Sequence, residues 1–296
     1  MKIGRMGERK LIDHIWGLVG GKNEDEDVHF LDNGGKYLLL AMDTINEGFH
    51  FERSWNPEQI GKFLVDINLS DIAAKNGIPL ELMVSFSFPR DLEETWVSKL
   101  VSGMKGEVEK YGLKFSGGDL KEARRISLTG LVIGEVHKGR EFRRSGAKPG
   151  DYVYISSRIG KQERAIRSYY NGEKGSEGDI LDITPRLDLR ERLSKAGVTS
   201  CIDNSDGIYK SLALISRLSG VRIVIENDVT INSKGERERR SLFSLGGDYE
   251  LIFTSPRRLR GFPVVGRVVE GKGLVDIDGN THPPEGFDHF RSFRRP

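Results

Sequence analysis

Cysteine is almost missing from this sequence: Cys201 is the one cysteine among 296 residues. A single cysteine excludes an internal disulfide and is typical of a reducing compartment, so we expect a cytoplasmic protein. Because Val198 precedes it closely and Ile202 follows it directly, we expect Cys201 to be a buried thiol and not a nucleophile.

Long apolar runs are also missing. No stretch of the chain approaches the roughly 20 apolar residues that cross a membrane as a helix. Residues 2–21 contain several apolar side chains, but Asp13 and His14 interrupt them, and the pattern is that of an amphipathic helix. We therefore expect neither a signal peptide nor a membrane span here.

An excess of charge of either sign is missing as well. Lys and Arg number 46 and Asp and Glu number 44, for a formal net charge of +2. This balance gives no electrostatic reason to expect a nucleic-acid or membrane partner. The length and the 37% of hydrophobic residues are typical of a soluble protein with two domains. We place the boundary where a segment rich in Arg, Lys and Gly begins, which divides residues 1–137 from residues 138–296.

Three familiar catalytic motifs are absent. Gly160-Lys161 lacks both the earlier glycine and the following Ser or Thr of a Walker loop. No His/Glu pair has the helical spacing of the H-E-x-x-H zinc motif. Ser205-Asp206 is not surrounded by a nucleophile elbow, so a hydrolase triad is not indicated.

What the sequence does contain is a series of aspartates after apolar, strand-like segments. The stretch Val65–Gly77 reads as a short buried segment, a polar turn and a helix capped by Ser70, which would place Asp71 in the first helical turn. Four other aspartates also follow apolar, strand-like segments: Asp43, Asp119, Asp203 and Asp206. Strand ends are where α/β folds keep their sites, although capping and turn roles stay open for each acid.

A predicted hairpin adds a sixth acid. Val28–Leu31 and the strand that ends at Asp43 flank a turn at Asn33-Gly34-Gly35, and their pairing would bring Asp27 near Asp43. Six carboxylates in one cleft need arginines or hard cations to balance their charge. Carboxylates without matching His or Cys clusters favour Mg²⁺ or Ca²⁺. Gly117-Gly118 would let a backbone approach a phosphate closely, so the pattern indicates Mg²⁺-dependent phosphoryl transfer.

The rest of the chain predicts alternating strands and helices. We expect strands at 83–88, 126–136, 152–156 and 221–225, and helices at 92–111, 187–196 and 207–218. We expect a loop at 171–179 and an exposed charged stretch at 232–240.

The motifs, taken in order, resemble a known family. They are Asp43-Thr44 with Gly48-Phe49-His50-Phe51, then Asn68-Leu69-Ser70-Asp71-Ile72-Ala73-Ala74, Gly117-Gly118-Asp119, Arg144 to Asp151, Ile202 to Gly207, Asp248-Tyr249-Glu250-Leu251 and Gly286 to Phe290. In this order they resemble the thiamine-monophosphate kinases of the aminoimidazole-ribonucleotide-synthetase-like ATP-binding superfamily.

The resemblance implies a two-domain α/β (α+β) fold and a homodimer. Residues 1–137 would form the ATP- and Mg²⁺-binding domain, closing a β-barrel across the dimer interface, and residues 138–296 a C-terminal α/β domain. The implied reaction is ATP-dependent phosphorylation of thiamine monophosphate to thiamine diphosphate, with no nucleic-acid or membrane partner.

The resemblance also implies roles for individual residues. The implied metal ligands are Asp27, Asp43, Asp71, Asp119, Asp203 and Asp206, of which Asp71, Asp119 and Asp206 would be catalytic. The implied ATP contacts are Gly118, Asp119, Arg144 and Ser205, and the implied substrate contact is His50.

Four positions depart from the family pattern. Asp25-Glu26-Asp27 stands where Gly-Asp-Asp is usual, and Ala41-Met42 precedes Asp43 where hydroxyl residues are usual. Gly247 replaces a glutamate, and Pro284 stands where an aromatic residue lines the substrate site. Two alternatives therefore stay open: a relative that phosphorylates another small molecule, and a nucleotide-binding paralogue without turnover.

Overall fold

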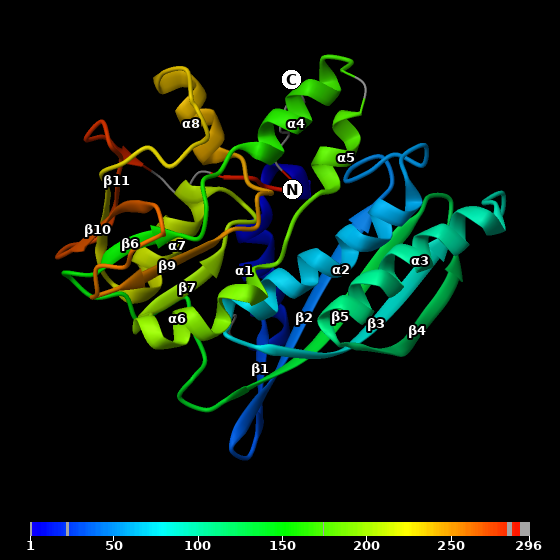
Figure 1. The fold of residues 1–296 in the computed structure, drawn as a ribbon, viewed down its shortest axis with the longest axis horizontal. Coiled ribbons are helices and arrows are strands. Elements are labelled where there is room, and N and C mark those ends of the chain that lie inside the picture. The colour runs from blue at the N-terminus through cyan, green and yellow to red at the C-terminus, as the bar shows by residue number, and fades with distance from the viewer. Residues whose placement is uncertain (1, 22–23, 174, 283–285, 291–296) are drawn as a thin grey trace.

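Two β-sheets lie side by side in the computed structural model, which describes residues 2–21, 24–173, 175–282 and 286–290 (Figure 1). The strands of the first sheet fall between His29 and His137, and those of the second between Tyr152 and His282. Helices pack on both sheets, so the expected mixed α/β class is confirmed.

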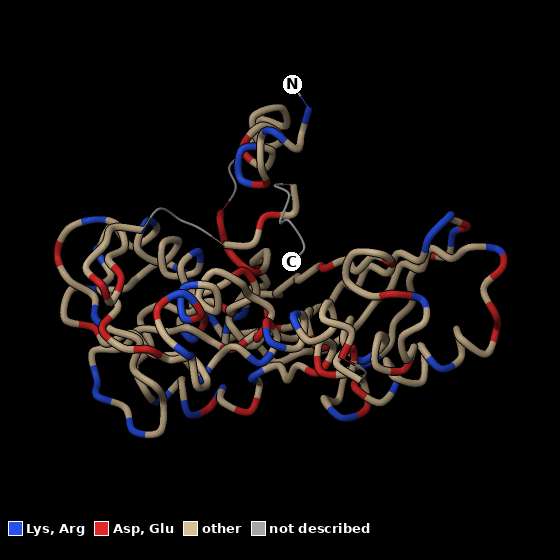
Figure 2. Tube along the Cα trace, turned by 90° about the horizontal axis from the view of Figure 1, so that it is seen from above, with Lys and Arg blue, Asp and Glu red and all other residues tan. Residues whose placement is uncertain are grey.

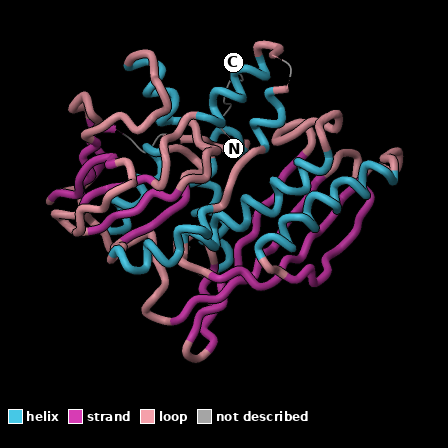
Figure 3. The backbone as a smooth tube through the Cα atoms, viewed as in Figure 1, coloured by secondary structure: helices cyan, strands magenta, loops and turns pink. Residues whose placement is uncertain are grey.

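The first sheet has five strands in the order β1-β2-β5-β3-β4. They are β1 (His29–Asn33), β2 (Lys36–Asn46), β3 (Ile78–Phe88), β4 (Lys114–Glu122) and β5 (Ser127–His137). All neighbours are antiparallel except β3 and β4. The helices α2 (Pro57–Ala74) and α3 (Glu94–Tyr111) cover one face (Figure 3). Exposed apolar side chains on these strands are Leu31, Met42, Ile78, Met83, Phe115 and Leu120.

Helix α2 corrects the prediction for Val65–Gly77. It is one continuous helix from Pro57 to Ala74, begun by Asn56, whose side chain accepts from the Glu58 backbone N–H at 3.0 Å. Of its 18 residues, 13 are buried. A helix buried on nearly all sides has no polar stripe, and its apolar run cannot be told from a buried strand by periodicity. Asp71 therefore lies in the last turn of a helix and not in the first.

The second sheet has seven strands in the order β12-β11-β8-β10-β6-β9-β7. They are β6 (Tyr152–Ile155), β7 (Ser200–Asp203), β8 (Arg222–Ile225), β9 (Leu251–Ser255), β10 (Val264–Val269), β11 (Gly273–Val275) and β12 (Thr281–His282). The helices of this half are α4 (Lys161–Tyr170), α5 (Ser176–Leu181), the 3₁₀ helix η2 (Arg186–Leu189), α6 (Arg190–Ala196), α7 (Ile208–Ser219) and α8 (Glu236–Ser244).

Some expected boundaries differ from the structure. Asp43 and Asp119 lie inside β2 and β4 and not at strand ends, whereas Asp203 does end β7. The expected loop 171–179 contains the start of α5, and the charged stretch 232–240 contains the first half of α8. Both helices are short and rich in polar residues, so their apolar periodicity is weak.

The N-terminal segment stands apart from the two sheets (Figure 2). A short 3₁₀ helix, η1 (Ile3–Arg5), leads into α1 (Glu8–Val19), the amphipathic helix expected from the sequence. No residue of α1 is buried, and Leu18 is 74% exposed. The start of α1 is fixed by its Glu8 backbone N–H, which donates to the Asp288 carboxylate at 3.0 and 3.1 Å. None of the helices in the described ranges has the length and apolar character needed to cross a membrane.

The C-terminal end of α2 joins the two sheets. Ala73 and Ala74 pack in an apolar cluster with Leu193 and with Phe253 of β9, while the earlier turns of α2 pack in the core of the first sheet. Because Asp71 precedes these alanines by two residues, the junction brings acids from both halves together.

Candidate active site

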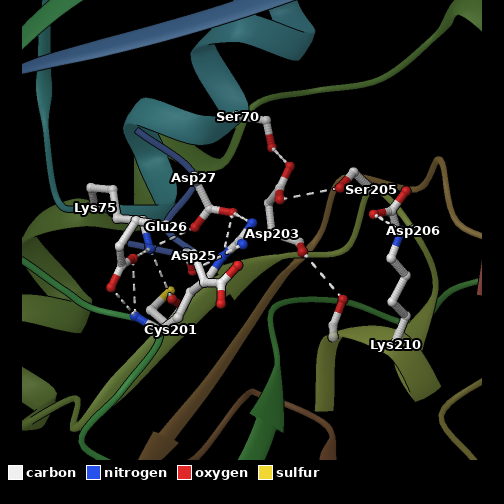
Figure 4. Close-up of polar contacts among 12 residues, drawn as sticks. Asp25, Glu26, Asp27, Ser70, Lys75, Cys201, Asp203, Ser205, Asp206 and Lys210 are labelled. Atoms are coloured by element: carbon white, nitrogen blue, oxygen red, sulfur yellow. Dashed lines mark hydrogen bonds and ion pairs between the residues drawn. The ribbon is translucent and has the colours of Figure 1, made fainter. Parts of the chain in front are cut away.

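Three carboxylates from three separate elements meet at this junction. Asp27 precedes β1, Asp71 lies in the last turn of α2, and Asp203 ends β7. One carboxylate oxygen of each lies within 4.8 Å of the others, a spacing that could hold a metal ion. Hydroxyls fix Asp203: Ser70 Oγ donates to Oδ2 at 2.9 Å, and Ser205 Oγ donates to Oδ1 at 3.5 Å (Figure 4).

Two further acids border these three, and the group carries too little positive charge. Burial and the charges of Asp206 and Asp27 raise the pKa of Asp43 to about 6, so Asp27 does lie near Asp43 as the hairpin predicts. Burial and the charge of Asp27 raise the pKa of Asp203 to about 7. Burial, with Asp43 and Asp203 nearby, raises the pKa of Asp71 well above its ordinary value. A bound cation would reverse these shifts.

A fully buried amide points to the same conclusion. Among the described residues, neither the Nδ2 nor the Oδ1 atom of Asn204 has a hydrogen-bond partner. Buried polar atoms are almost always paired, so a ligand or an ion shell is the natural partner for this amide beside Asp203. Oxygen donors without His or Cys suit Mg²⁺, and the donor set fits that ion.

The position of Asp71 strengthens the preference for a cation. The C-terminal end of a helix carries a partial negative charge, so α2 disfavours the Asp71 anion where the predicted helix start would have favoured it. Asn68, one turn earlier and fully buried, accepts from the Asp43 backbone N–H at 3.1 Å. Helix α2 therefore positions acids on two elements and adds its own negative end to the site.

Positive side chains reach only part of this acidic group. Arg144 Nε donates to Asp27 Oδ1 at 2.9 Å, and Lys75 Nζ lies 2.5 Å from Asp27 Oδ2. Burial would raise the pKa of Asp27, but Arg144 and Lys75 outweigh it, and the pKa falls below its ordinary value. Lys210 Nζ lies 2.7 Å from Asp206. The sequence motifs include Arg144 but neither Lys75 nor Lys210, so the sequence gives no signal for these two lysines.

Asp119 is not brought to the other acids within this chain. It lies on β4, the edge strand opposite β1, and its exposed carboxylate pairs with Lys121 Nζ at 3.0 Å. Gly117 faces open space, but a Cβ at Gly118 would lie 1.7 Å from the Val84 carbonyl oxygen. Close contact with β3 is therefore one reason for glycine at Gly118, apart from any phosphate.

An aromatic group borders the acids. The His50 ring lies 4.8 Å from the Phe49 ring and 6.0 Å from the His289 ring, and Phe287 contacts both Phe49 and His289. Burial and the charge of His289 lower the pKa of His50 to about 4, so its imidazole is neutral. Its Nδ1 accepts from the Asn46 backbone N–H at 3.0 Å. Pro284 lies outside the described residues.

Tyr249 lies near the acids, although the sequence gives it no role beyond its place in a motif. Burial and the charges of Asp43 and Asp203 raise the pKa of its phenol well above its ordinary value. Its φ of 52° is in the left-handed region, where a bulky residue is strained unless its surroundings hold it. Because this strain is invisible in the sequence, the motif Asp248 to Leu251 gave no reason to single out the tyrosine.

This chain resembles known proteins both over its first sheet and over nearly its whole length. The family model described as AIR synthase related protein, N-terminal domain, matches residues 23–136, which places the first sheet and its helices in that class. A thiamine-monophosphate kinase of Aquifex aeolicus is 30% identical over 98% of this chain and 100% of its own length. That of Pyrococcus horikoshii is 34% identical over 84% of each chain. The chain belongs to the thiamine-monophosphate kinase family.

Solved structures agree with this assignment. A structure of AaThiL complexed with AMPPCP and TMP superposes with a TM-score of 0.89 at 30% identity, covering 98% of this chain and 99% of that one. The hydrogenase maturation protein HypE in complex with ATP shares the fold alone, with a TM-score of 0.69 at 17% identity over 92% of this chain.

Proposed function

We propose that this chain transfers a phosphoryl group from ATP to thiamine monophosphate and so forms thiamine diphosphate. The observation that carries the proposal is the meeting of Asp27, Asp71 and Asp203 between the two sheets of a family member. The AaThiL complex with AMPPCP and TMP supports both ligands, because that chain matches this one over nearly its whole length.

Mg²⁺ is part of the proposal. Asp27, Asp43, Asp71, Asp203 and Asp206 would hold it within one chain, and Asp71 and Asp206 would be catalytic. The bound ion would neutralise phosphate oxygens during transfer. Support comes from the raised pKa values of the buried acids and from the unpaired Asn204 amide.

Other residues of this chain would bind ATP and the substrate. Gly118, Asp119, Arg144 and Ser205 are the proposed ATP contacts. His50 is the proposed substrate contact. Phe49 and His289 contact His50, and Phe287 contacts both of them. The rings of Phe49 and Phe287 would provide aromatic faces for a flat cationic ring, worth about 0.5–2 kcal/mol each. They supply a platform despite Pro284, which supports thiamine monophosphate over another acceptor.

We also propose a homodimer, formed through the face of the first sheet opposite α2 and α3. Met42 and Met83 both pair with Leu131 of β5, so they lie on this face, where they are 68% and 37% exposed, and pairing with a second copy would bury them. The barrel implied by the resemblance would then close between the two sheets. Since Asp119 lies far from its own chain's acids, the dimer is the assembly in which it could reach a site. The single Cys201 supports a cytoplasmic location.

The division of the chain at residue 137 remains a proposal as well. The first sheet ends at His137 and the second begins at Tyr152, so the two sheets lie on either side of it.

Two measurements test the function. Isothermal titration with AMPPCP should give binding that depends on Mg²⁺, and no binding under either condition would reject the nucleotide site. A coupled ADP-release assay over a panel of free and phosphorylated vitamins should give turnover with thiamine monophosphate. Turnover with another acceptor and none with thiamine monophosphate would reject thiamine monophosphate as the substrate, while the assignment as a kinase would stand.

A further inference from the structure

Lys75 is a buried cation that the proposed reaction does not use. It follows the last residue of α2, and its side chain is fully buried. Its Nζ lies 2.6 Å from Glu26 Oε2, 2.5 Å from Asp27 Oδ2 and 3.3 Å from the Cys201 carbonyl oxygen (Figure 4). Lysine is almost never fully buried unless it is paired. Two carboxylates and a carbonyl are also the oxygen donors that a hard metal ion takes.

Glu26 is the partner that explains the lysine. It stands in the segment Asp25-Glu26-Asp27, directly before the metal-site acid Asp27. Both of its carboxylate oxygens also accept from the Arg144 backbone N–H, at 3.1 and 3.2 Å. Glu26 and Lys75 thus bring one negative and one positive charge, and their effects on the charge of the site cancel.

The charges of the site are unevenly distributed as a result. Glu26 and Asp27 face Lys75 and Arg144, so this side of the site is balanced by protein groups. On the other side, Asp43, Asp71 and Asp203 have no lysine or arginine within salt-bridge distance among the described residues. The charge of Arg144 acts on Asp71 and Asp203 without an ion pair, and a metal ion would balance the remaining negative charge. The carboxylates of Asp71 and Asp203 lie in the same cluster as that of Asp27, whose position Lys75 helps to fix.

We propose that Lys75 is a positioning residue whose ammonium occupies a cation position between Glu26 and Asp27. It orients Asp27 toward Asp71 and Asp203 and keeps a further divalent ion out of this position. The inference rests on the proposed Mg²⁺ site. A merely structural lysine that ties α2 to β7 would leave the metal content unchanged.

Counting bound ions tests the proposal. Mn²⁺ is titrated into the full chain without nucleotide, and free Mn²⁺ is measured by electron paramagnetic resonance. Lys75→Met should bind one Mn²⁺ per chain more than the wild type, because the two carboxylates then lack their cation. Lys75→Arg should restore the wild-type number. A folded Lys75→Met variant with the wild-type number would overturn the proposal.

A second variant covers the case in which Lys75→Met unfolds in EDTA. Refolding of Lys75→Met on addition of Mn²⁺ would support the proposal, since the ion then replaces the ammonium. If Lys75→Met does not refold with Mn²⁺ while Lys75→Met/Glu26→Gln folds, Lys75 serves only to balance the charge of Glu26, and the proposal is overturned. If the wild type itself binds no Mn²⁺, the proposed metal site fails. If it binds Mn²⁺ and Lys75→Met adds none, this inference alone fails.

Discussion

Asp71 is an acid whose own helix opposes its charge. Because a metal ion is the proposed compensation, Asp71→Asn should lower kcat by more than about 100-fold, the upper end of the loss caused by disturbing a metal's outer shell. The fold should be retained or stabilised, since repulsion with Asp43 and Asp203 falls. Steady-state kinetics and thermal melting of the same preparation measure both effects.

Asp91→Asn is the matched control for this change. Asp91 is 78% exposed and, within the described part of the chain, makes only a surface pair with Arg53, so its loss should alter neither quantity measurably. If Asp71→Asn melts early but retains its activity per folded molecule, Asp71 is a structural residue and not a metal ligand.

Asp66 is a buried acid outside the candidate site, on α2 where it packs against α3. Burial and the neighbouring Glu107 raise the pKa of Asp66 to about 8, although Lys62 Nζ lies 3.5 Å away and Lys110 is near. Between the ordinary aspartate pKa near 4 and about 8, the folded chain holds a proton that the unfolded chain has lost. The free energy of unfolding should therefore fall as pH rises through this window, by at most about 1.4 kcal/mol per pH unit for this group.

Asp66→Asn isolates this contribution. Urea unfolding from pH 5 to pH 9 should give a flatter pH profile for the variant, which becomes the more stable protein at the alkaline end. Parallel profiles for the two proteins would mean that Asp66 is ionised in the folded state, with Lys62 as its effective partner.

At the scale of elements, two glycines set the distance between α2 and α3. An ideal Cβ at Gly61 would lie 2.0 Å from the Leu100 carbonyl oxygen, and one at Gly103 would lie 1.9 Å from that of Glu58. Gly61→Ala must push the helices apart and should destabilise the fold by about 1–3 kcal/mol. Gly106→Ala, in α3 with nothing within 4 Å of its Cβ, should stabilise it by about 0.5–1 kcal/mol.

Urea denaturation of both alanine variants measures the difference. If the two substitutions change the free energy of unfolding equally, helix propensity alone determines their effect, and the close contact between α2 and α3 does not contribute to stability.

The elements that the sequence predicted well are those with a clear surface face. Helix α3 buries one side, strand β5 alternates buried and half-buried positions, and their expected ranges nearly match the structure. Helix α2 has no such face, so its first half was missed. The sequence singled out Asp71 and Asp203 because they lie in motifs, and Asp27 because a predicted hairpin follows it. The roles of Lys75 and Tyr249 depend on burial and on backbone strain, which a sequence does not display.

At the scale of the whole molecule, the uncovered sheet face predicts the assembly. Light scattering should give a mass of about twice the 33.2 kDa of one chain. Met42→Glu should shift the mass toward one chain, because it places a charge on the proposed interface. Val101→Glu, at a position 41% exposed on α3, is the control and should leave the mass unchanged. A stable wild-type monomer at micromolar concentration would contradict the dimer.

Helix α2 also determines whether the two halves of the chain unfold together. Its first turns belong to the core beneath the first sheet, and Ala73 and Ala74 belong to the cluster that packs on the second. Neither core can lose the helix without exposing apolar surface in the other, and the buried Lys75 ammonium would lose Cys201 if the halves separated. Melting is therefore expected to be cooperative across both sheets, a single calorimetric transition despite two separate sheets.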